Sequence, residues 1–513
     1  MSRTHRARST ARPVTAEVAG LLERGYDQFQ RGQLTEAEIT FRKAHALAPD
    51  DLQAAQMLAM AMSDRGDWSD AVEILDRFLE RVGPPSEPNQ AFYNNYGNAL
   101  RRAKRVDDAE TVLRELVRVA PKDWHGWHNL GQTLCDKNHH HEAVAALRRA
   151  VALEPSIASN QALLGEILFK LGRYNSALAT LERCFALGPV FDPNVWTVYG
   201  NTYRQLGQLH NAVAALRKAL EFVPDSANAY SNLGLVLAGT GAFAEAIAIL
   251  NQAIDMDPQS DTIKANAAYV HLTAGDMARG WDLWRYGILG GPRGYARRQD
   301  MQEWSPASPG TRALVYREQG VGDELIFAST YPDMIANSNE VIIESDSRLV
   351  SLFQRSFPTA TVRGWQFTLK NGELIEPPDY DRIIPCGGLP RWFRRDASQF
   401  PGTPYLVPDP ERVAAWGERL AGMPRPIIGF SWRSIVKTAE RRLEYTQLGE
   451  WGDVFGASDA TWVNLQYDDC ERDLVMAERK FGVNILRWPW LDLKDDFEEV
   501  AALMCHLDLV VAP

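Results

Sequence analysis

The chain has 513 residues, and its 55 Lys plus Arg against 66 Asp plus Glu give a formal net charge of −11 and a pI near 5.5. This length predicts about three domains at roughly 150 residues each, and 45% hydrophobic with 24% charged residues excludes a mostly disordered chain. The net acidity argues against a nucleic-acid-binding protein, because neutralising phosphates requires clustered Lys and Arg, and it disfavours binding to anionic membranes.

The amino terminus and the cysteines both indicate a cytoplasmic protein. Residues 1–17 carry four arginines and no apolar segment of a secretion signal, so we expect a disordered basic tail, with a transit peptide as the alternative. No apolar run approaches the ~20 residues that span a bilayer, so no membrane span is expected. The five cysteines include no C-x-x-C pair, which fits neither a disulfide framework nor a zinc site.

Prolines recur through the first half of the chain at intervals of 34, 34, 35 and 34 residues: Pro121, Pro155, Pro189, Pro224 and Pro258. Small residues and leucines recur at fixed distances before them, as in Ala143, Leu147 and Ala150. A period of 34 with small residues at helix contacts is typical of the tetratricopeptide repeat, which the region resembles. The resemblance implies an α-helical solenoid over residues 18–288.

The register of this pattern predicts seven full repeats, at 18–51, 52–85, 90–123, 124–157, 158–191, 193–226 and 227–260. A proline-bearing insertion separates the second repeat from the third, and we expect the stack to bend or loosen there. A degenerate unit follows from Asp261 to about Ile288. It has Trp281 and Trp284 in place of small residues, which predicts a capping repeat docked on the next domain.

Asparagines occupy the sixth position of four repeats: Asn95, Asn129, Asn232 and Asn266. An Asn amide both donates and accepts hydrogen bonds, so such a row can hold an extended peptide backbone. A similar asparagine ladder occurs in the O-GlcNAc transferase family, and the resemblance implies a peptide-binding groove. Leu163 and Val198 interrupt the row. The alternative is that Asn before Leu-Gly is only a consensus habit of such repeats.

A linker rich in Gly and Pro is predicted over residues 289–311, after which strands alternate with helices. The first unit predicts, in order, strand Ala313–Tyr316, loop Arg317–Asp323, helix Glu324–Ala336 and strand Val341–Glu344. A second unit predicts strands at Ile427–Ser431, Trp462–Leu465, Asn484–Arg487 and Leu509–Val511, with helices near 446–455, 470–481 and 495–506. We therefore expect two Rossmann-like subdomains, 312–408 and 425–513.

Four short motifs lie on or directly after the predicted strands: Glu318-Gln-Gly-Val-Gly-Asp323, Gly429-Phe-Ser-Trp-Arg433, Asn464-Leu-Gln466 and Leu507-Asp-Leu-Val510. In this order they resemble the heptosyltransferase-like glycosyltransferases, over about residues 312–513. The resemblance implies a GT-B glycosyltransferase module after the solenoid, an α plus α/β architecture. In similar proteins further sheet follows the last motif, whereas this chain ends at Pro513. We therefore expect an incomplete second subdomain, from a fragment or an incomplete gene model.

Asp323 is the candidate catalytic residue. A carboxylate there can take a proton from an acceptor hydroxyl, and heptosyltransferase-like proteins have their proposed base at this aspartate. The alternative is that Asp323 is merely an N-cap, a common role for Asp. Gly320 and Gly322 are predicted donor-binding residues, since a Gly-x-Gly turn after a strand lets the backbone approach a ligand closely.

A local basic cluster follows the first strand of the second subdomain and comprises Arg433, Lys437, Arg441 and Arg442. Cations of this kind balance the charge of a leaving diphosphate, and Arg433 matches the position where similar proteins contact donor phosphate. Local pairing on a solvated loop is the alternative. Gln466 is predicted to contact the base or ribose, with a simple polar strand end as the alternative.

Together these features predict a glycosyltransferase that moves a sugar from a nucleotide-sugar donor to a Ser or Thr hydroxyl of a protein held in the repeat groove. By analogy the acceptor is flagellin or another bacterial surface protein. No carboxylate pair has evident metal spacing, so we expect no metal and no cofactor beyond the donor substrate. The second hypothesis is a protein-binding scaffold with a catalytically inactive sheet domain. A dinucleotide oxidoreductase is disfavoured because the Gly-x-Gly-x-x-Gly spacing is missing.

Overall fold

The computed structural model describes residues 16–289, 301–308, 310–365, 368–370, 373–375, 379–434 and 445–512. The chain divides into two compact units, Met1–Thr202 and Tyr203–Pro513. The division falls inside the repeat array, upstream of the predicted linker. Most of the predicted basic tail lies outside the described residues.

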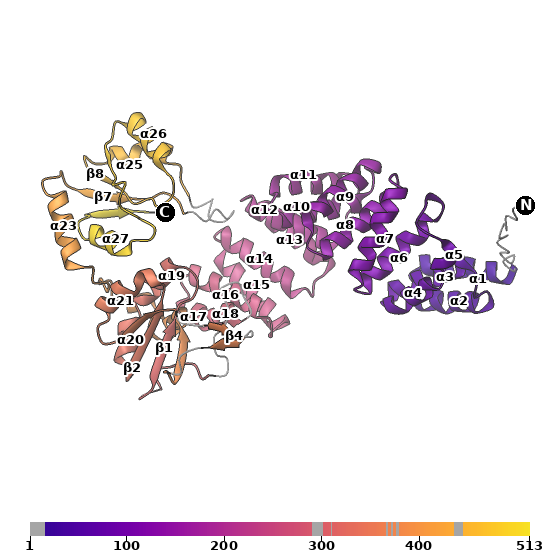
Figure 1. The fold of residues 1–513 in the computed structure, drawn as a ribbon, viewed down its shortest axis with the longest axis horizontal. Coiled ribbons are helices and arrows are strands. Elements are labelled where there is room, and N and C mark those ends of the chain that lie inside the picture. The colour runs from indigo at the N-terminus through magenta and orange to yellow at the C-terminus, as the bar shows by residue number, and fades with distance from the viewer. Residues whose placement is uncertain are drawn as a thin grey trace, which may run out of the picture. The chain divides into compact units, whose positions relative to one another are not determined.

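The first unit is a series of helix pairs, coloured indigo to magenta in Figure 1. Its helices are α1 (Ala16–Gln30), α2 (Leu34–Leu47), α3 (Leu52–Arg65), α4 (Trp68–Asp76), α5 (Leu79–Val82), α6 (Gln90–Arg102), α7 (Val106–Val119), α8 (Trp124–Asp136), α9 (His140–Leu153), α10 (Ala158–Lys170), α11 (Tyr174–Ala186) and α12 (Pro193–Gln205). These helices coincide with the predicted repeats. The insertion after the second repeat forms a short 3-10 helix, Glu87–Asn89.

A glycine on the first helix of a repeat packs against a leucine on the second. A Cβ built on the glycine would lie only 2.6–2.7 Å from the leucine side chain in four repeats: Gly97–Leu113, Gly131–Leu147, Gly165–Leu181 and Gly234–Leu250. Real Cβ atoms do not approach other atoms so closely, so the two helices fit together only because glycine has no side chain. This contact explains the Leu-Gly signature that the sequence repeats.

The second unit begins with the remaining helices of the array: α13 (Leu209–Phe222), α14 (Ala227–Gly239), α15 (Phe243–Met256), α16 (Asp261–Thr273), α17 (Met277–Trp284) and α18 (Tyr286–Leu289). The region with sheets follows. The first sheet has the order β3-β2-β1-β6, with all strands parallel: β1 (Arg312–Tyr316), β2 (Glu340–Ser345), β3 (Thr361–Gly364) and β6 (Arg382–Pro385). A separate antiparallel hairpin comprises β4 (Thr368–Lys370) and β5 (Glu373–Ile375).

The helix predicted over Glu324–Ala336 is in fact two helices, α19 (Val321–Ala328) and α20 (Tyr331–Ala336). Pro332 causes the break, because it has no N–H to donate to the carbonyl of Ala328 and its ring would clash there. The first helix also starts earlier than predicted, since Gly320 serves as its N-cap. Two short helices follow in this subdomain, α21 (Val350–Ser356) and α22 (Pro390–Phe393).

The second sheet is also entirely parallel, in the order β10-β7-β8-β9. Its strands are β7 (Ile427–Phe430), β8 (Thr461–Asn464), β9 (Ile485–Leu486) and β10 (Leu509–Val511). They confirm the four predicted strands: β10 has the predicted bounds, β8 is shifted by one residue, and β7 and β9 are shorter than predicted. The helices of this region are α23 (Pro410–Leu420), α25 (Gly452–Gly456), α26 (Glu471–Phe481) and α27 (Phe497–Met504).

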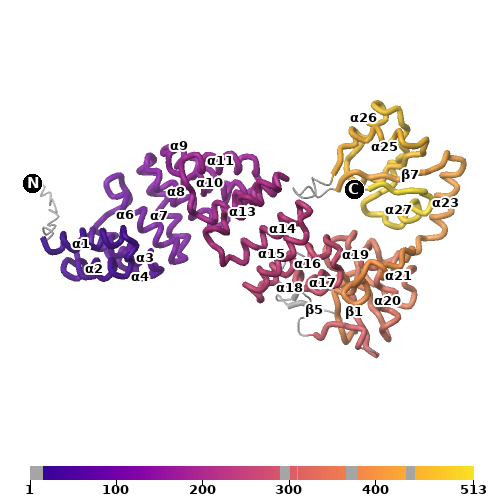
Figure 2. The backbone as a smooth tube through the Cα atoms, turned by 180° about the vertical axis from the view of Figure 1, so that it is seen from behind, coloured from indigo at the N-terminus to yellow at the C-terminus, as the bar shows by residue number. Residues whose placement is uncertain are grey.

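The last repeat packs on the first sheet, as predicted from its tryptophans. Trp281 and Trp284 of α17 contact the core of the first-sheet subdomain, and both rings meet Phe327 edge-on. Figures 1 and 2 show α17 beside β1 and α19 from opposite sides. Part of the predicted linker belongs to this core as well, because the side chain of Trp304 is fully buried. The backbone N–H of Trp304 donates to the carbonyl of Ile383 on β6.

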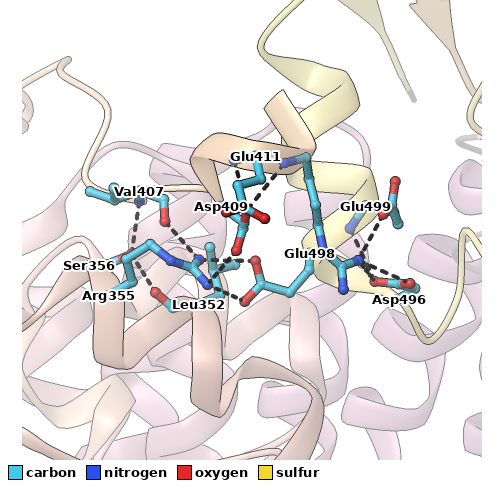
Figure 3. A network of polar contacts seen from close by, with 10 residues as sticks. Leu352, Arg355, Ser356, Val407, Asp409, Glu411, Asp496, Glu498 and Glu499 are labelled. Carbon is cyan, nitrogen blue, oxygen red and sulfur yellow. Dashed lines mark hydrogen bonds and ion pairs between the residues drawn. The ribbon is translucent and has the colours of Figure 1, made fainter. Parts of the chain in front are cut away.

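Ion pairs join the two sheet subdomains, as Figure 3 shows. On α21, Arg355 donates to both oxygens of Glu498 on α27 at 3.0 Å, and also to the carbonyl of Val407 at 3.2 Å. Beside this pair, Arg412 of α23 contacts Glu499 at 2.9 Å and Asp496 at 3.3 Å. The last helix of the chain therefore contacts an element of the first-sheet subdomain.

Candidate functional site

The loop after β1 leads directly into α19 and holds the first group of predicted site residues. The carboxylate Oδ2 of Asp323 accepts the backbone N–H of Gly320 at 3.0 Å, which satisfies one free N–H at the helix start. Gly320 is the N-cap, so the prediction of Asp323 as N-cap is wrong in position: its carboxylate caps the first turn from the third helical residue. Its role as a base stays a prediction. A Cβ on Gly322 would meet no atom within 4 Å, so this turn faces open space.

A buried carboxyl next to Asp323 was missed by the sequence analysis. Glu324 is fully buried; its Oε2 accepts the N–H of Asp346 at 2.9 Å and its Oε1 lies 3.0 Å from Arg317. Burial raises the pKa of Glu324 to about 7. Hydrogen bonds from Arg348 lower the pKa of Asp346 to about 2. Arg348 also pairs with Asp495 at 2.6 Å.

These groups share the carboxyl edge of the first sheet, where ligands of parallel sheets bind. Arg317 follows β1 and Asp346 follows β2, so both positions directly follow strands that the sequence predicted. That placement is the signal that could have identified them. Glu324 gave no signal of its own, because one helical carboxylate looks like another until its burial is known.

A second buried carboxylate lies between the loops that follow β1 and β6, where the strand order of the first sheet reverses. Glu318 is 5% exposed and accepts the indole N–H of Trp284 at 3.0 Å. A Cβ on Gly387 would lie 2.3 Å from Glu318 and 2.6 Å from the Trp284 nitrogen. The capping repeat therefore contributes a side chain at the topological switch point, where open α/β sheets bind ligands.

Arg433 follows β7 and is held by carboxylates of its own subdomain. Its guanidinium contacts Asp468 at 2.8 Å and Asp473 at 2.7 Å. Gln466, which is 2% exposed, accepts the N–H groups of Trp432 and Arg433 and donates to the carbonyl of Arg433 at 2.9 Å. The structure thus brings the predicted pair Arg433 and Gln466 together, and Gln466 holds the backbone of the loop.

The other members of the predicted basic cluster, Lys437, Arg441 and Arg442, lie outside the described residues. Within the described part of the chain, no hydrogen bond or ion pair joins Asp323 to Arg433 or Gln466. The two predicted groups therefore occupy the carboxyl edges of two different sheets.

The predicted asparagines of the groove differ from one another in their contacts. Asn129 donates to Asn94 Oδ1 at 3.1 Å, and Asn266 donates to the hydroxyl of Ser231 at 3.0 Å. Both bonds run from the sixth position of a repeat to the fifth position of the preceding one. Asn95 is exposed, and neither it nor Asn232 has a side-chain hydrogen bond to another described residue. Two of the four amides thus connect neighbouring repeats, and the peptide-binding role of the four stays a prediction.

The structure offers no evident metal ligands in the residues that it describes, since no three His, Cys, Asp or Glu side chains converge there. Every helix in the described ranges is too short or too polar to cross a membrane.

Comparison with known sequences identifies the repeats. Tetratricopeptide repeat patterns match residues 57–123, 128–189 and 227–260, and a TPR repeat pattern matches residues 200–241. The amino-terminal half is therefore an array of tetratricopeptide repeats. Protein FlbA of Caulobacter vibrioides is 28% identical over 334 residues, which cover 62% of this chain and 56% of that protein. The chain thus spans about half the length of this curated relative.

Solved structures of repeat proteins are similar in part. The APC/C hetero-tetramer Cut9–Hcn1 is 17% identical with a TM-score of 0.42, over 52% of each chain. MamA protein is 23% identical with a TM-score of 0.31, over 33% of this chain and 93% of that one.

Proposed function

We propose that the chain is a glycosyltransferase that moves a sugar from a nucleotide-sugar donor to a Ser or Thr hydroxyl of a protein bound by the repeats. One observation carries this proposal: two parallel four-stranded sheets follow each other, and the motif residues lie at their carboxyl edges. A GT-B enzyme has its ligands at such edges. Tetratricopeptide repeats supply the protein-binding part of the function.

In this proposal Asp323 is the base and Arg433 the cation for the leaving group. Asp323 uses Oδ2 for the helix cap, and its Oδ1 has no partner among the described residues, so one oxygen is left for a proton. The carboxylate takes the proton of the acceptor hydroxyl, the oxygen attacks the anomeric carbon, and the bond from that carbon to the diphosphate oxygen breaks. The nucleoside diphosphate leaves with the bonding pair, and the configuration inverts.

Arg433 must exchange partners to serve the diphosphate. Asp468 and Asp473 hold its guanidinium at 2.8 and 2.7 Å, so a phosphate has to replace at least one of them. A diphosphate carries more negative charge than one carboxylate and can accept two guanidinium N–H groups at once, whereas each aspartate accepts one, which favours the exchange.

A second candidate function rests on the same contacts. Asp323 caps a helix, Gln466 holds a loop and Arg433 is paired, so each predicted site residue already has a local structural role. This favours a protein-binding scaffold in which the sheets have no catalytic activity. The two functions differ in whether the sheet region binds nucleotide.

Thermal shift with UDP, GDP, ADP, CDP and CMP tests the proposal. We expect one nucleotide to raise the thermal unfolding midpoint of the chain, and we expect Arg433→Ala to abolish this rise. Arg487→Ala is the matched control, because Arg487 pairs with Glu471 and Glu478, is 27% exposed against 24% for Arg433, and follows the edge strand β9. Asp323→Asn keeps a cap acceptor and should keep the nucleotide shift while losing transfer. No shift with any nucleotide would favour the scaffold.

A further inference from the structure

Two irregularities of the repeat pattern meet in one pocket of the first unit. The asparagine row is interrupted by Leu163 and Val198, and the interval from Pro189 to Pro224 is 35 residues where the others are 34. Leu163, Val198 and the lengthened segment 189–192 all line a pocket of about 370 Å³. Ligand pockets span roughly 300–1,000 Å³, so this pocket lies at the small end of that range and cannot enclose a long stretch of peptide.

The lengthened segment between α11 and α12 forms one wall of the pocket, and helices α8, α10, α11 and α12 supply the rest of the lining. The indole N–H of Trp196 donates to the carbonyl of Val190 at 2.9 Å and fixes this segment against α12. Phe191 is 73% exposed and belongs to the lining, next to the apolar side chains of Leu163 and Val198. One extra residue therefore gives this repeat junction an apolar recess.

The charge of the lining is negative. Glu166 and Asp192 line the pocket, and no Lys or Arg does. Burial lowers the pKa of His128, which also lines the pocket, so this ring is neutral at pH 7. Lys170 pairs with Glu166 at 2.8 Å, whereas the carboxylate of Asp192 accepts only the backbone N–H of Asn194, at 2.8 Å, among the described residues. Asp192 is thus the main uncompensated negative group.

We propose that this pocket is a specificity site that receives an apolar side chain of the bound protein, with a neighbouring Lys or Arg facing Asp192 and Glu166. The inference rests on the proposed function in one respect, that the repeats hold the acceptor. Asparagines contact the peptide backbone and so accept any sequence, whereas an apolar recess with an acidic rim selects side chains. The acceptor is therefore chosen by a short apolar and basic segment.

Selection from a random dodecapeptide display library tests this directly, without any sugar donor. The full chain should enrich peptides that carry Leu, Ile, Met or Phe with Lys or Arg within two positions. Ser159→Trp fills the recess from an exposed lining position and should weaken binding of a fluorescein-labelled selected peptide at least about tenfold. Glu166→Gln with Asp192→Asn should weaken it by about two- to fivefold per charge, because each rim charge is partly exposed.

The matched control is Glu142→Gln with Asp107→Asn, which removes two exposed carboxylates outside the pocket lining. It should bind the peptide as the unchanged chain does. Enriched peptides without an apolar and basic pair, or full binding by Ser159→Trp, would overturn the proposal. If the unchanged chain forms a dimer and Ser159→Trp dissociates it, the occupant of the pocket is a second copy of the chain. That result would also overturn the proposal. Because no nucleotide takes part, these outcomes are independent of whether the sheets transfer sugar.

Discussion

Glu324 makes the stability of the second unit depend on pH in a direction opposite to that of most carboxylates. Burial raises its pKa from 4.5 to about 7. Below pH 4.5 the Glu324 carboxyl is protonated in both the folded and the unfolded chain. Between pH 4.5 and about 7 it is ionised in the unfolded chain and still protonated in the folded one. The folded state therefore loses stability as the pH rises through this window. Glu324→Gln should remove the loss, since an amide keeps an acceptor for the N–H of Asp346 and has no charge to bury.

The size of the effect follows from the shift. From 4.5 to about 7, at 1.36 kcal/mol per unit, the loss amounts to about 3 kcal/mol above pH 7. The glutamine variant should therefore gain about 3 kcal/mol over the unchanged chain between about pH 4.5 and 8. Asp346→Asn is the control of opposite sign, because a pKa lowered to about 2 stabilises the folded state above pH 3.8 and its benefit is lost as the pH falls toward 2.

Two measurements check this reasoning. Difference infrared titration of the full chain should show a protonated carboxyl that persists to about neutral pH and is missing in Glu324→Gln. Scanning calorimetry at a series of pH values should show the difference in stability widening with pH. Parallel stability curves for the two proteins, or a carboxyl band lost already near pH 4.5, would refute a buried neutral Glu324.

Three further predictions concern packing and pairing. Gly131→Ala should cost about 1–3 kcal/mol, because its Cβ would lie 2.6 Å from Leu147, while Gly20→Ala, with no atom within 4 Å, should gain about 0.5–1 kcal/mol. If calorimetry showed unfolding temperatures that change in the same direction for both variants, this prediction would be contradicted. Trp284→Phe keeps the ring contact but removes a donor to buried Glu318, so we expect a loss of about 1–3 kcal/mol, relieved by Glu318→Gln in the same chain. Arg355→Met and Glu498→Gln should show a coupling of about 1 kcal/mol in a double-mutant cycle of thermal midpoints, and additive effects would exclude it.

The repeats were predictable from sequence because each contact recurs. The Leu-Gly pair, the alternation of small residues and the terminal proline follow from one packing geometry used again and again, so chance agreement is small. The strands of the sheets were predictable for a similar reason, since short apolar runs such as Ile427–Phe430 are buried on both faces. The break between α19 and α20 was not predictable, because the apolar pattern continues through Pro332 and hides the effect of that proline.

The candidate site was only partly predictable. Motifs placed Arg433 and Gln466 just after strands and Asp323 at the start of the following helix, where the structure has them, but the partners of Arg433 come from elsewhere in the chain. Asp468 and Asp473 follow a different strand from Arg433, and no local pattern pairs them. The raised pKa of Glu324 likewise depends on a tertiary environment that a sequence does not display.

The contacts of Trp284 with Phe327 and Glu318 limit how this protein can be divided into fragments or joined to other repeats. A fragment that begins at β1 would leave Phe327 and Glu318 without their indole cover, and the exposed apolar surface would favour aggregation. A chimera that exchanges one solenoid for another has to carry α17 along with the sheets. The smallest part that keeps these contacts intact is then the sheets together with the last repeat, and exchanging repeats upstream of α17 leaves these contacts in place.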